Sequence, residues 1–135
     1  MGRVYLLSSM IVPVPFEYKS ATVTIEEISA EEARRLLKNG FISAVGHEPT
    51  ARFLSRILGL EVKPSRETIY LNEGDVAIAI QFRERIQKLE LQEDEIEEYF
   101  RKGKVRLLKI TVNTLKRSVK NILKAKKRST RRLIN

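Results

Sequence analysis

The stretch that decides the fold of this chain runs from residue 41 to residue 58 and reads FISAVGHEPTARFLSRIL. Its first five residues are apolar or small, which predicts a short buried strand over 41–45. A Gly-His-Glu turn follows, and Pro49 suits the first turn of a helix, where its missing amide costs nothing. The apolar positions of that helix recur at helical spacing: Phe53, Leu54, Ile57 and Leu58. Gly59 is expected to end it.

Two strands and one helix are predicted before this stretch. Residues 4–7 form a short apolar run, and residues 21–28 alternate between apolar and polar side chains. Two prolines favour a loop over residues 9–19 between them. Ser29-Ala30-Glu31-Glu32 is a capping-box signature, so a helix is expected to begin after Ser29.

The elements predicted after the stretch complete a layered domain. Residues 67–71 and 76–82 flank an Asn-Glu-Gly-Asp turn, which predicts a β-hairpin. Residues 93–102 form a helix with acidic residues early and basic residues late, and residues 105–112 form the last strand. This order predicts an α+β fold: a single mixed β-sheet with flanking helices.

Composition excludes several classes of protein. The 135 residues include no Cys and one His, which rules out disulfide frameworks, thiolate zinc sites, Cys nucleophiles and two-His metal centres. No phosphate-binding or dinucleotide-binding glycine motif is present, so no cofactor is expected. No apolar run approaches the roughly 18–20 residues of a membrane span, so a cytoplasmic protein without membrane contact is expected. Abundant Lys and Glu are compatible with a thermophilic source.

The net charge of +9 is concentrated at the C-terminal end. Residues 101–135 hold 14 Lys and Arg and no carboxylate, whereas residues 1–100 are mildly acidic. We therefore expect a domain over 1–112 and a basic amphipathic extension over 113–135. Asn113 is expected to cap a helix from Thr114 to about Lys127.

That extension has two readings. Its basic face can bind a polyanion such as a nucleic acid through phosphate contacts. Alternatively, its apolar face docks on the body or across a dimer, and the charges form only a solvated surface. The residues expected to contact nucleic acid in the first case are Lys116, Lys120, Lys124 and Lys127.

His47, the one imidazole of the chain, lies in the turn between the predicted strand and helix of the opening stretch. Backbone amides at a helix start point outward, and the positive end of the helix attracts phosphate. An imidazole titrates near neutral pH and can act as a general acid toward an oxygen leaving group. The alternative is a histidine that only caps or packs at the turn.

Other polar residues near the predicted strand ends are candidates for holding a phosphate or a sugar. Gln81 and Arg85 leave the end of the strand 76–82, where arginine can grip a phosphate and glutamine can read a base edge or hydroxyl. Arg66 and Ser8 are further candidates. Each of these residues is also compatible with an ordinary solvated surface.

The run KNGFISAVGHEPTA over residues 38–51 resembles the ring-nuclease family of anti-CRISPR proteins from archaeal viruses and bacteriophages. That family's pattern is a short strand, Gly-His-x-Ser/Thr-Thr, and a helix that ends in Leu-Gly. The resemblance covers residues 3 to about 112. Further agreement lies outside the run, at Val4-Tyr5-Leu6, Gly59, Arg66, Gln81 and Arg85.

The resemblance implies a metal-independent phosphodiesterase. It implies a homodimer that binds a cyclic oligoadenylate, typically cyclic tetra-adenylate, the second messenger of type III CRISPR complexes. A ribose 2′-hydroxyl attacks the adjacent phosphodiester and leaves a 2′,3′-cyclic phosphate. On this resemblance His47 protonates the departing 5′ oxygen and Arg85 stabilises the charged phosphorane. The implied ligand-binding residues are Ser8, Gly46, Thr50, Arg66 and Gln81.

The chain departs from the family pattern at two positions that bear on activity. Ser8 stands where the family usually has Asn, and Lys88 stands where it often has Glu just after the arginine. A base in place of an acid removes an orienting partner or changes the pocket. The alternatives to cleavage are therefore binding of the ring without cutting, or a dimeric nucleic-acid-binding or regulatory protein that acts through its basic C-terminal helix.

Overall fold

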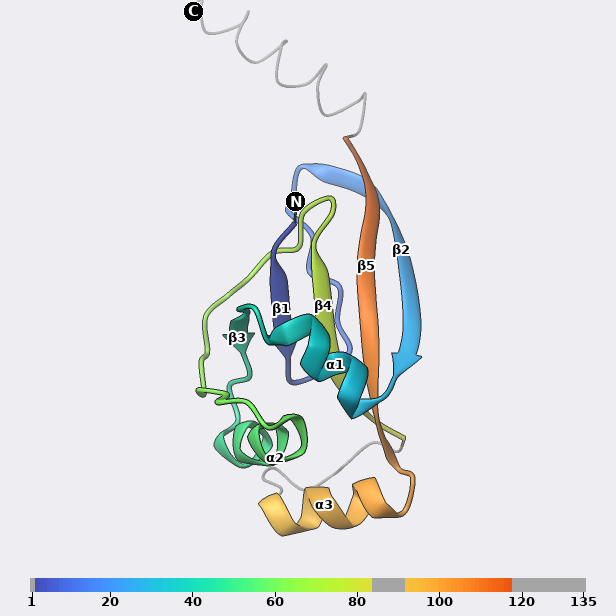
Figure 1. Cartoon of the computed structure of the whole chain (residues 1–135). Coiled ribbons are helices and arrows are strands. Elements are labelled where there is room, and N and C mark those ends of the chain that lie inside the picture. Colours follow the sequence, from blue (N-terminus) through green and yellow to red (C-terminus); the bar gives the residue numbers. More distant parts are fainter. Residues whose placement is uncertain (1, 84–91, 118–135) are drawn as a thin grey trace, which may run out of the picture.

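The computed structural model describes residues 2–83 and 92–117 (Figure 1). Five strands and three helices lie in these residues. In chain order they are β1 (Val4–Leu7), β2 (Tyr18–Ile28), α1 (Ala30–Leu37), β3 (Ile42–Ala44), α2 (Glu48–Leu58), β4 (Val76–Phe82), α3 (Glu93–Arg101) and β5 (Val105–Arg117). The predicted α+β class with a single mixed sheet is confirmed. No helix among the described residues is long and apolar enough to cross a membrane.

The five strands form one sheet in the order β2-β5-β4-β1-β3. β1 pairs in parallel with both β3 and β4, while β5 is antiparallel to β4 and to β2. The carboxyl ends of β1, β3 and β4 therefore lie at the same end of the sheet, which we call the carboxyl edge. Figure 1 shows α2 and α3 at that edge, and the far ends of β2 and β5 projecting from the opposite edge.

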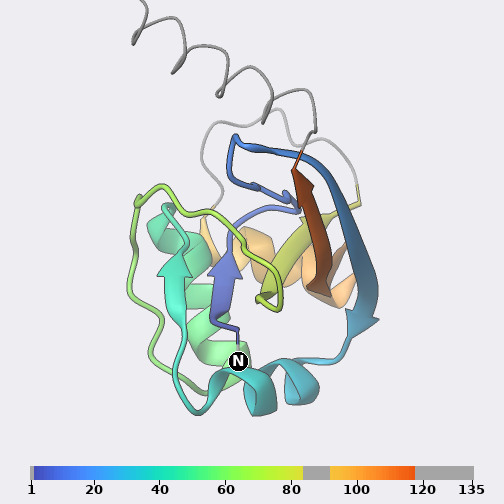
Figure 2. The same cartoon turned by 90° about the horizontal axis from the view of Figure 1, so that it is seen from above.

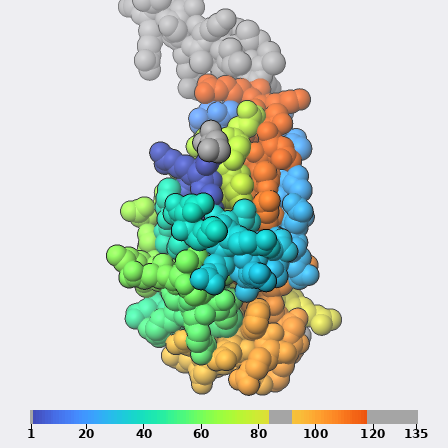
Figure 3. Space-filling view, in the orientation of Figure 1, coloured from blue at the N-terminus to red at the C-terminus, as the bar shows by residue number. Residues whose placement is uncertain are grey.

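The two faces of the sheet bury different clusters. Alternation along β4 sends Ile78 and Ile80 to the helix-covered face, where they pack with Phe53 and Leu54 of α2. Ala77 and Ala79 face the other way and pack with a second apolar cluster that includes Leu71. In the space-filling view, the helices cover only the lower part of their face, below the projecting ends of β2 and β5 (Figure 3).

Local signals in the sequence locate α1, α2 and α3 correctly. The Ser29 side chain accepts a hydrogen bond from the Glu32 amide at 3.1 Å, which caps α1 as the capping-box signature predicted. α2 ends at Gly59, whose φ of 66° lies in the left-handed region that glycine adopts without strain. The predicted helix near residues 93–102 is α3, with acidic residues in its first turn.

The predicted hairpin between residues 67–71 and 76–82 is wrong. Residues 67–71 form no strand, because β4 is already hydrogen-bonded to a neighbour on both sides, to β1 and to β5. The connection from α2 to β4 instead passes along the β3 edge (Figure 2). Leu71 is buried in the second cluster, and its amide donates to the Pro13 carbonyl at 2.7 Å.

The predicted helix from Thr114 is wrong for its first four residues. β5 continues to Arg117 because β2 begins earlier than predicted, at Tyr18, and the two strands pair along this whole length. Asn113 therefore caps no helix, and its side-chain amide donates to the Thr24 hydroxyl on β2 at 2.7 Å. The expected boundary after residue 112 falls inside β5. The rest of the predicted helix lies outside the described residues.

Candidate functional site

The parallel strands bring several of the predicted site residues to their shared carboxyl edge. Leu7 of β1 is in register with Ala44 of β3 and with Ala79 of β4, so β1 and β3 end at the same level, while β4 continues for three more residues to Phe82. β3 lies on one side of β1 and β4 on the other. Open α/β sheets commonly bind ligands at the carboxyl ends of their strands, at the place where the strand order reverses on either side of a central strand.

The turn from β3 into α2 places His47 at the start of a helix, where the sequence predicted it. His47 is the N-cap of α2, half-buried and extended, with Pro49 in the first turn. The His47 carbonyl accepts from the Ala51 amide at 3.0 Å, so the backbone begins the helix and the imidazole makes no capping hydrogen bond. Because Pro49 has no N–H, the Glu48 and Thr50 amides are the first-turn donors without an acceptor inside the helix.

Arg66 lies against Gly46, at the turn between β3 and α2. Its Nε donates to the Gly46 carbonyl oxygen at 3.3 Å. A Cβ added at Gly46 would lie 3.1 Å from the Arg66 Cγ, so glycine at this position lets the arginine pass close to the turn. The guanidinium of an exposed residue is thereby held beside the start of α2.

Three hydrogen bonds fix the segment that carries Arg66. The Ser65 amide donates to the Val45 carbonyl at 2.9 Å, and the Ser43 hydroxyl donates to the Lys63 carbonyl at 2.7 Å. The Ser55 hydroxyl accepts from the Val62 amide at 2.9 Å. The connection after α2 is thus attached both to β3 and to the helix, which gives Arg66 a defined position without a strand.

Thr50 and Ser8 differ in how far a ligand can reach them. Thr50 lies in the first turn of α2 and is only 5% exposed, so little of its side chain is accessible to a ligand. Its backbone amide remains the group that faces a bound phosphate in the predicted role. Ser8 is half-buried directly after β1, at the same edge.

Gln81 lies on the other side of β1 from His47. Its Oε1 accepts a hydrogen bond from the Arg106 Nε at 2.8 Å, across the β4–β5 pair. Strands β3 and β4 are two strand spacings apart, about 10 Å. One protomer therefore presents Gly46, His47 and Arg66 as one group and Gln81 as a second group, with β1 between them.

A pocket of about 580 Å³ opens beside Gln81. Its polar lining includes three cationic residues and a single carboxylate, so it is suited to an anionic or strongly polar ligand. The residues that line it are Glu27, Gln81, Phe82, Arg83, Gly103, Lys104, Val105 and Arg106. Of these only Gln81 was a predicted site residue. The sequence could have indicated Arg106, because its spacing from Leu108 and Ile110 places this charged residue on the same strand face as two apolar ones.

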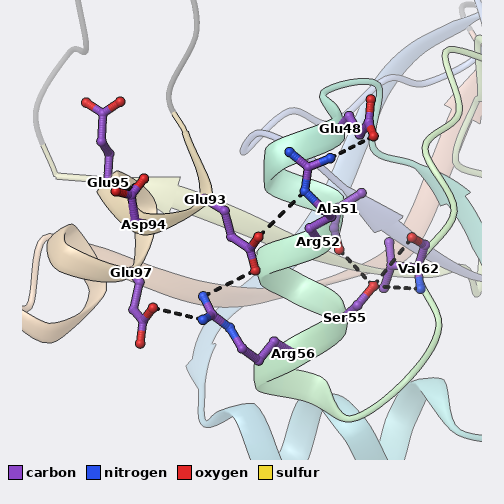
Figure 4. A network of polar contacts seen from close by, with 10 residues as sticks. All are labelled: Glu48, Ala51, Arg52, Ser55, Arg56, Val62, Glu93, Asp94, Glu95 and Glu97. Carbon is purple, nitrogen blue, oxygen red and sulfur yellow. Dashed lines mark hydrogen bonds and ion pairs between the residues drawn. The ribbon is translucent and has the colours of Figure 1, made fainter.

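An ionic ladder joins α2 to α3 near this edge (Figure 4). Arg52 contacts Glu48 at 2.6 Å on its own helix and Glu93 of α3 at 3.6 Å. Arg56 contacts Glu93 at 3.4 Å and Glu97 at 2.9 Å. These contacts, together with the edge-on packing of Phe53 and Phe100, hold α3 against α2, whose N-cap is His47.

Arg85 and Lys88 lie outside the described residues, as do Lys120, Lys124 and Lys127. Lys116 is described, and it lies exposed near the end of β5, at the opposite edge of the sheet from His47. Within residues 2–83 and 92–117, no group of three or more His, Cys, Asp or Glu is placed to hold a metal ion.

Comparison with known proteins gives relatives from archaeal viruses and from a bacterium. ORF117 of Acidianus two-tailed virus is 40% identical over 85 residues, which are 61% of this chain and 71% of that protein. Protein 26 of Sulfolobus islandicus filamentous virus is 38% identical over 62% of this chain and 71% of its own length. YddF of Bacillus subtilis is 28% identical over 62% of this chain and 75% of its own length.

The fold also matches a solved structure. B116 of Sulfolobus turreted icosahedral virus superposes with a TM-score of 0.61 at 25% sequence identity, covering 82% of this chain and 99% of that one. A family model described as STIV B116-like matches residues 4–105, from the start of β1 to the start of β5. These residues include β1, β3, β4 and all three helices, and therefore the edge described above. The chain accordingly belongs to the STIV B116-like family.

Proposed function

We propose that this protein is a metal-independent ring nuclease that binds and cleaves cyclic tetra-adenylate and so antagonises type III CRISPR signalling. The proposal rests on the family resemblance of the Gly-His segment and on the chemistry that its surroundings offer. Relatives encoded by archaeal viruses are in keeping with a role directed against a host defence. The ring is expected to bind a homodimer, because a symmetric ligand can contact the same site on two copies.

The observation that carries the proposal is the group formed by Gly46, His47 and Arg66 at the start of α2. Two first-turn amides and the helix dipole favour a phosphate there. The Arg66 guanidinium lies beside them, its Nε 3.3 Å from the Gly46 carbonyl, and adds positive charge. An imidazole adjacent to a held phosphate is placed to give a proton to a leaving oxygen.

The proposed reaction is an internal transesterification. A ribose 2′-oxygen forms a bond to the adjacent phosphorus and releases its proton to water, while the bond from phosphorus to the 5′ oxygen breaks. His47 gives its proton to that 5′ oxygen. The products are a 2′,3′-cyclic phosphate end and a 5′-hydroxyl end. Orientation of the 2′-hydroxyl in line and stabilisation of the phosphorane charge are the main sources of acceleration.

Incubation of the purified protein with cyclic tetra-adenylate and a chelator tests this proposal. Mass spectrometry of the products should show linear fragments with 2′,3′-cyclic phosphate ends. His47→Ala is expected to slow cleavage by about 10²–10⁴-fold, the usual contribution of a general acid. Ser29→Ala is the matched control, since it also alters a helix N-cap but at α1, which follows the opposite edge strand β2.

Two results would contradict the proposal. An intact ring after long incubation with enzyme in excess rules out cleavage, and equal rates for His47→Ala and wild type rule out the assigned proton donor. Tight binding of an intact ring would support the alternative of a messenger-binding protein that does not cut.

A second candidate function, binding of nucleic acid, is favoured by the distribution of charge. Residues 112–135 hold nine Lys and Arg and no carboxylate, which equals the net charge of the whole chain. The described part of this segment, to Arg117, pairs with β2 and leaves the sheet at the edge opposite His47. Such binding is expected to depend on phosphate contacts and to weaken steeply with salt.

Deletion of residues 118–135 separates the two functions. Loss of DNA or RNA binding with ring cleavage intact would make the basic segment an accessory to a ring nuclease. Loss of every detectable activity would favour the nucleic-acid-binding function. Lys116→Glu combined with Arg117→Glu reverses two charges within the described part of β5. This double variant should weaken nucleic-acid binding and leave ring cleavage unchanged.

A further inference from the structure

The contact between Arg106 and Gln81 fixes which end of the glutamine amide faces the pocket. A guanidinium has N–H donors and no acceptor, so the Gln81 atom 2.8 Å from the Arg106 Nε must be the carbonyl oxygen. The amide nitrogen of Gln81 then points away from Arg106. Its two N–H donors are the groups that Gln81 can offer to a ligand.

The strands hold this arrangement in place. Gln81 and Arg106 are directly opposite each other in the β4–β5 register. On the next strand Glu27 is in register with Leu108, and so lies diagonally beside Arg106 on the same face. The Arg106 Nη1 is 4.0 Å from the Glu27 carboxylate of β2, so the guanidinium is attracted by Glu27 on one side and bonds Gln81 on the other. Residues of three adjacent strands thus form a row that ends at Gln81.

The pocket of about 580 Å³ lies along this row, and Glu27, Gln81 and Arg106 all line it. A ligand in the pocket meets the amide of a half-buried Gln81 whose orientation is already set. Pre-orientation of a polar group lowers the entropy lost when a ligand binds.

We infer that Arg106 is a positioning residue that makes Gln81 a hydrogen-bond donor to the bound ring. The inference rests on the proposed function for the identity of the ligand. Gln81 then contacts an acceptor of the cyclic oligoadenylate, which is a phosphate oxygen, a ribose oxygen or a ring nitrogen of adenine. It does not contact the exocyclic amine of adenine, which is itself a donor.

Binding and cleavage of cyclic tetra-adenylate by four variants test this inference. Arg106→Met and Gln81→Met should each raise KM about tenfold, the effect of one lost hydrogen bond, with kcat nearly unchanged. The double variant should be no worse than either single one, because both changes remove the same contact. Gln81→Glu keeps the partner of Arg106 but has no N–H, so it should bind more weakly than Gln81→Met.

Two further variants control for the loss of a cation. Arg106→Lys keeps an N–H donor and should restore part of the affinity. Lys109→Met removes a cation from the same strand on its other face and should leave KM unchanged. Wild-type KM for Arg106→Met would overturn the inference. So would a double variant whose defect is the product of the single defects, since Arg106 would then contact the ring independently.

A spectroscopic measurement separates this inference from the proposed function. The side-chain amide signal of Gln81 in a ¹⁵N–¹H spectrum is identified by its loss in Gln81→Met. It should move toward the position of a solvent-exposed glutamine in Arg106→Met and stay in place in Lys109→Met. If wild type neither binds nor cuts the ring, the proposed function fails, and this shift still decides the positioning role: an unmoved signal overturns it.

Discussion

Asp75 offers a sharp test of what holds the sheet together. The residue is only 4% exposed and lies just before β4. Oδ1 accepts from the Arg3 amide at 2.8 Å, and Oδ2 accepts from the Asn72 amide at 2.7 Å. One side chain therefore joins the start of β1 to the turn that leads into β4. We predict that Asp75→Ala destabilises the protein strongly.

The magnitude follows from these two contacts. A hydrogen bond to a charged group contributes about 1.5–3 kcal/mol to stability. Arg3 and Asn72 are exposed residues, so water can reach their amides after the substitution, and the lower end of the range applies to both. The expected loss in the free energy of unfolding is about 3 kcal/mol for Asp75→Ala. Asp75→Asn keeps one accepting oxygen and should lose roughly half of that.

Urea unfolding followed by circular dichroism measures the effect. Asp94→Ala is the matched control, because Asp94 is the other Asp of the chain and lies exposed in the first turn of α3. It should cost no more than about 1 kcal/mol, as for a charge at a helix end. A loss below about 1 kcal/mol for Asp75→Ala would refute the assigned role of the two hydrogen bonds.

Three further predictions concern α2 and its surroundings. Gly59→Ala should lower the free energy of unfolding by about 1–2 kcal/mol in a thermal or urea melt, because φ is 66° there. Arg56→Ala breaks two partly exposed ion pairs and should cost about 1 kcal/mol at low salt, and less in 1 M NaCl. Gly46→Ala should reduce ring cleavage more than stability, since its Cβ would press on Arg66 at 3.1 Å. Equal losses of activity and stability would contradict that last prediction.

Much of the group around His47 was accessible from the sequence because its signals are local. Pro49 and Gly59 delimit α2, and the β3–α2 turn places His47 at the helix start whatever surrounds it. The contact between Arg66 and Gly46 could not be predicted from such local signals. It depends on hydrogen bonds between residues about 20 positions apart, such as Ser65 to Val45 and Ser43 to Lys63.

The errors share one physical cause. Residues 67–71 and Thr114–Arg117 both have strand-compatible side chains, but the sheet admits only strands for which an edge is open. β4 has no open edge for residues 67–71, whereas β2 offers its full length to β5 and extends that strand to Arg117. The local sequence pattern does not indicate which strands are already paired on both sides, because strand pairing is a property of the assembled sheet.

The sequence by itself determined the class of fold, the positions of α1, α2 and α3, and the segment in which the imidazole lies. These depend on turn residues, caps and hydrophobic period, which act over a few residues. Only the tertiary structure decided the strand order, the separation of His47 from Gln81 by β1, and the row from Glu27 through Arg106 to Gln81. Those features arise from pairing between distant strands, and pairing sets the direction in which each side chain can donate or accept.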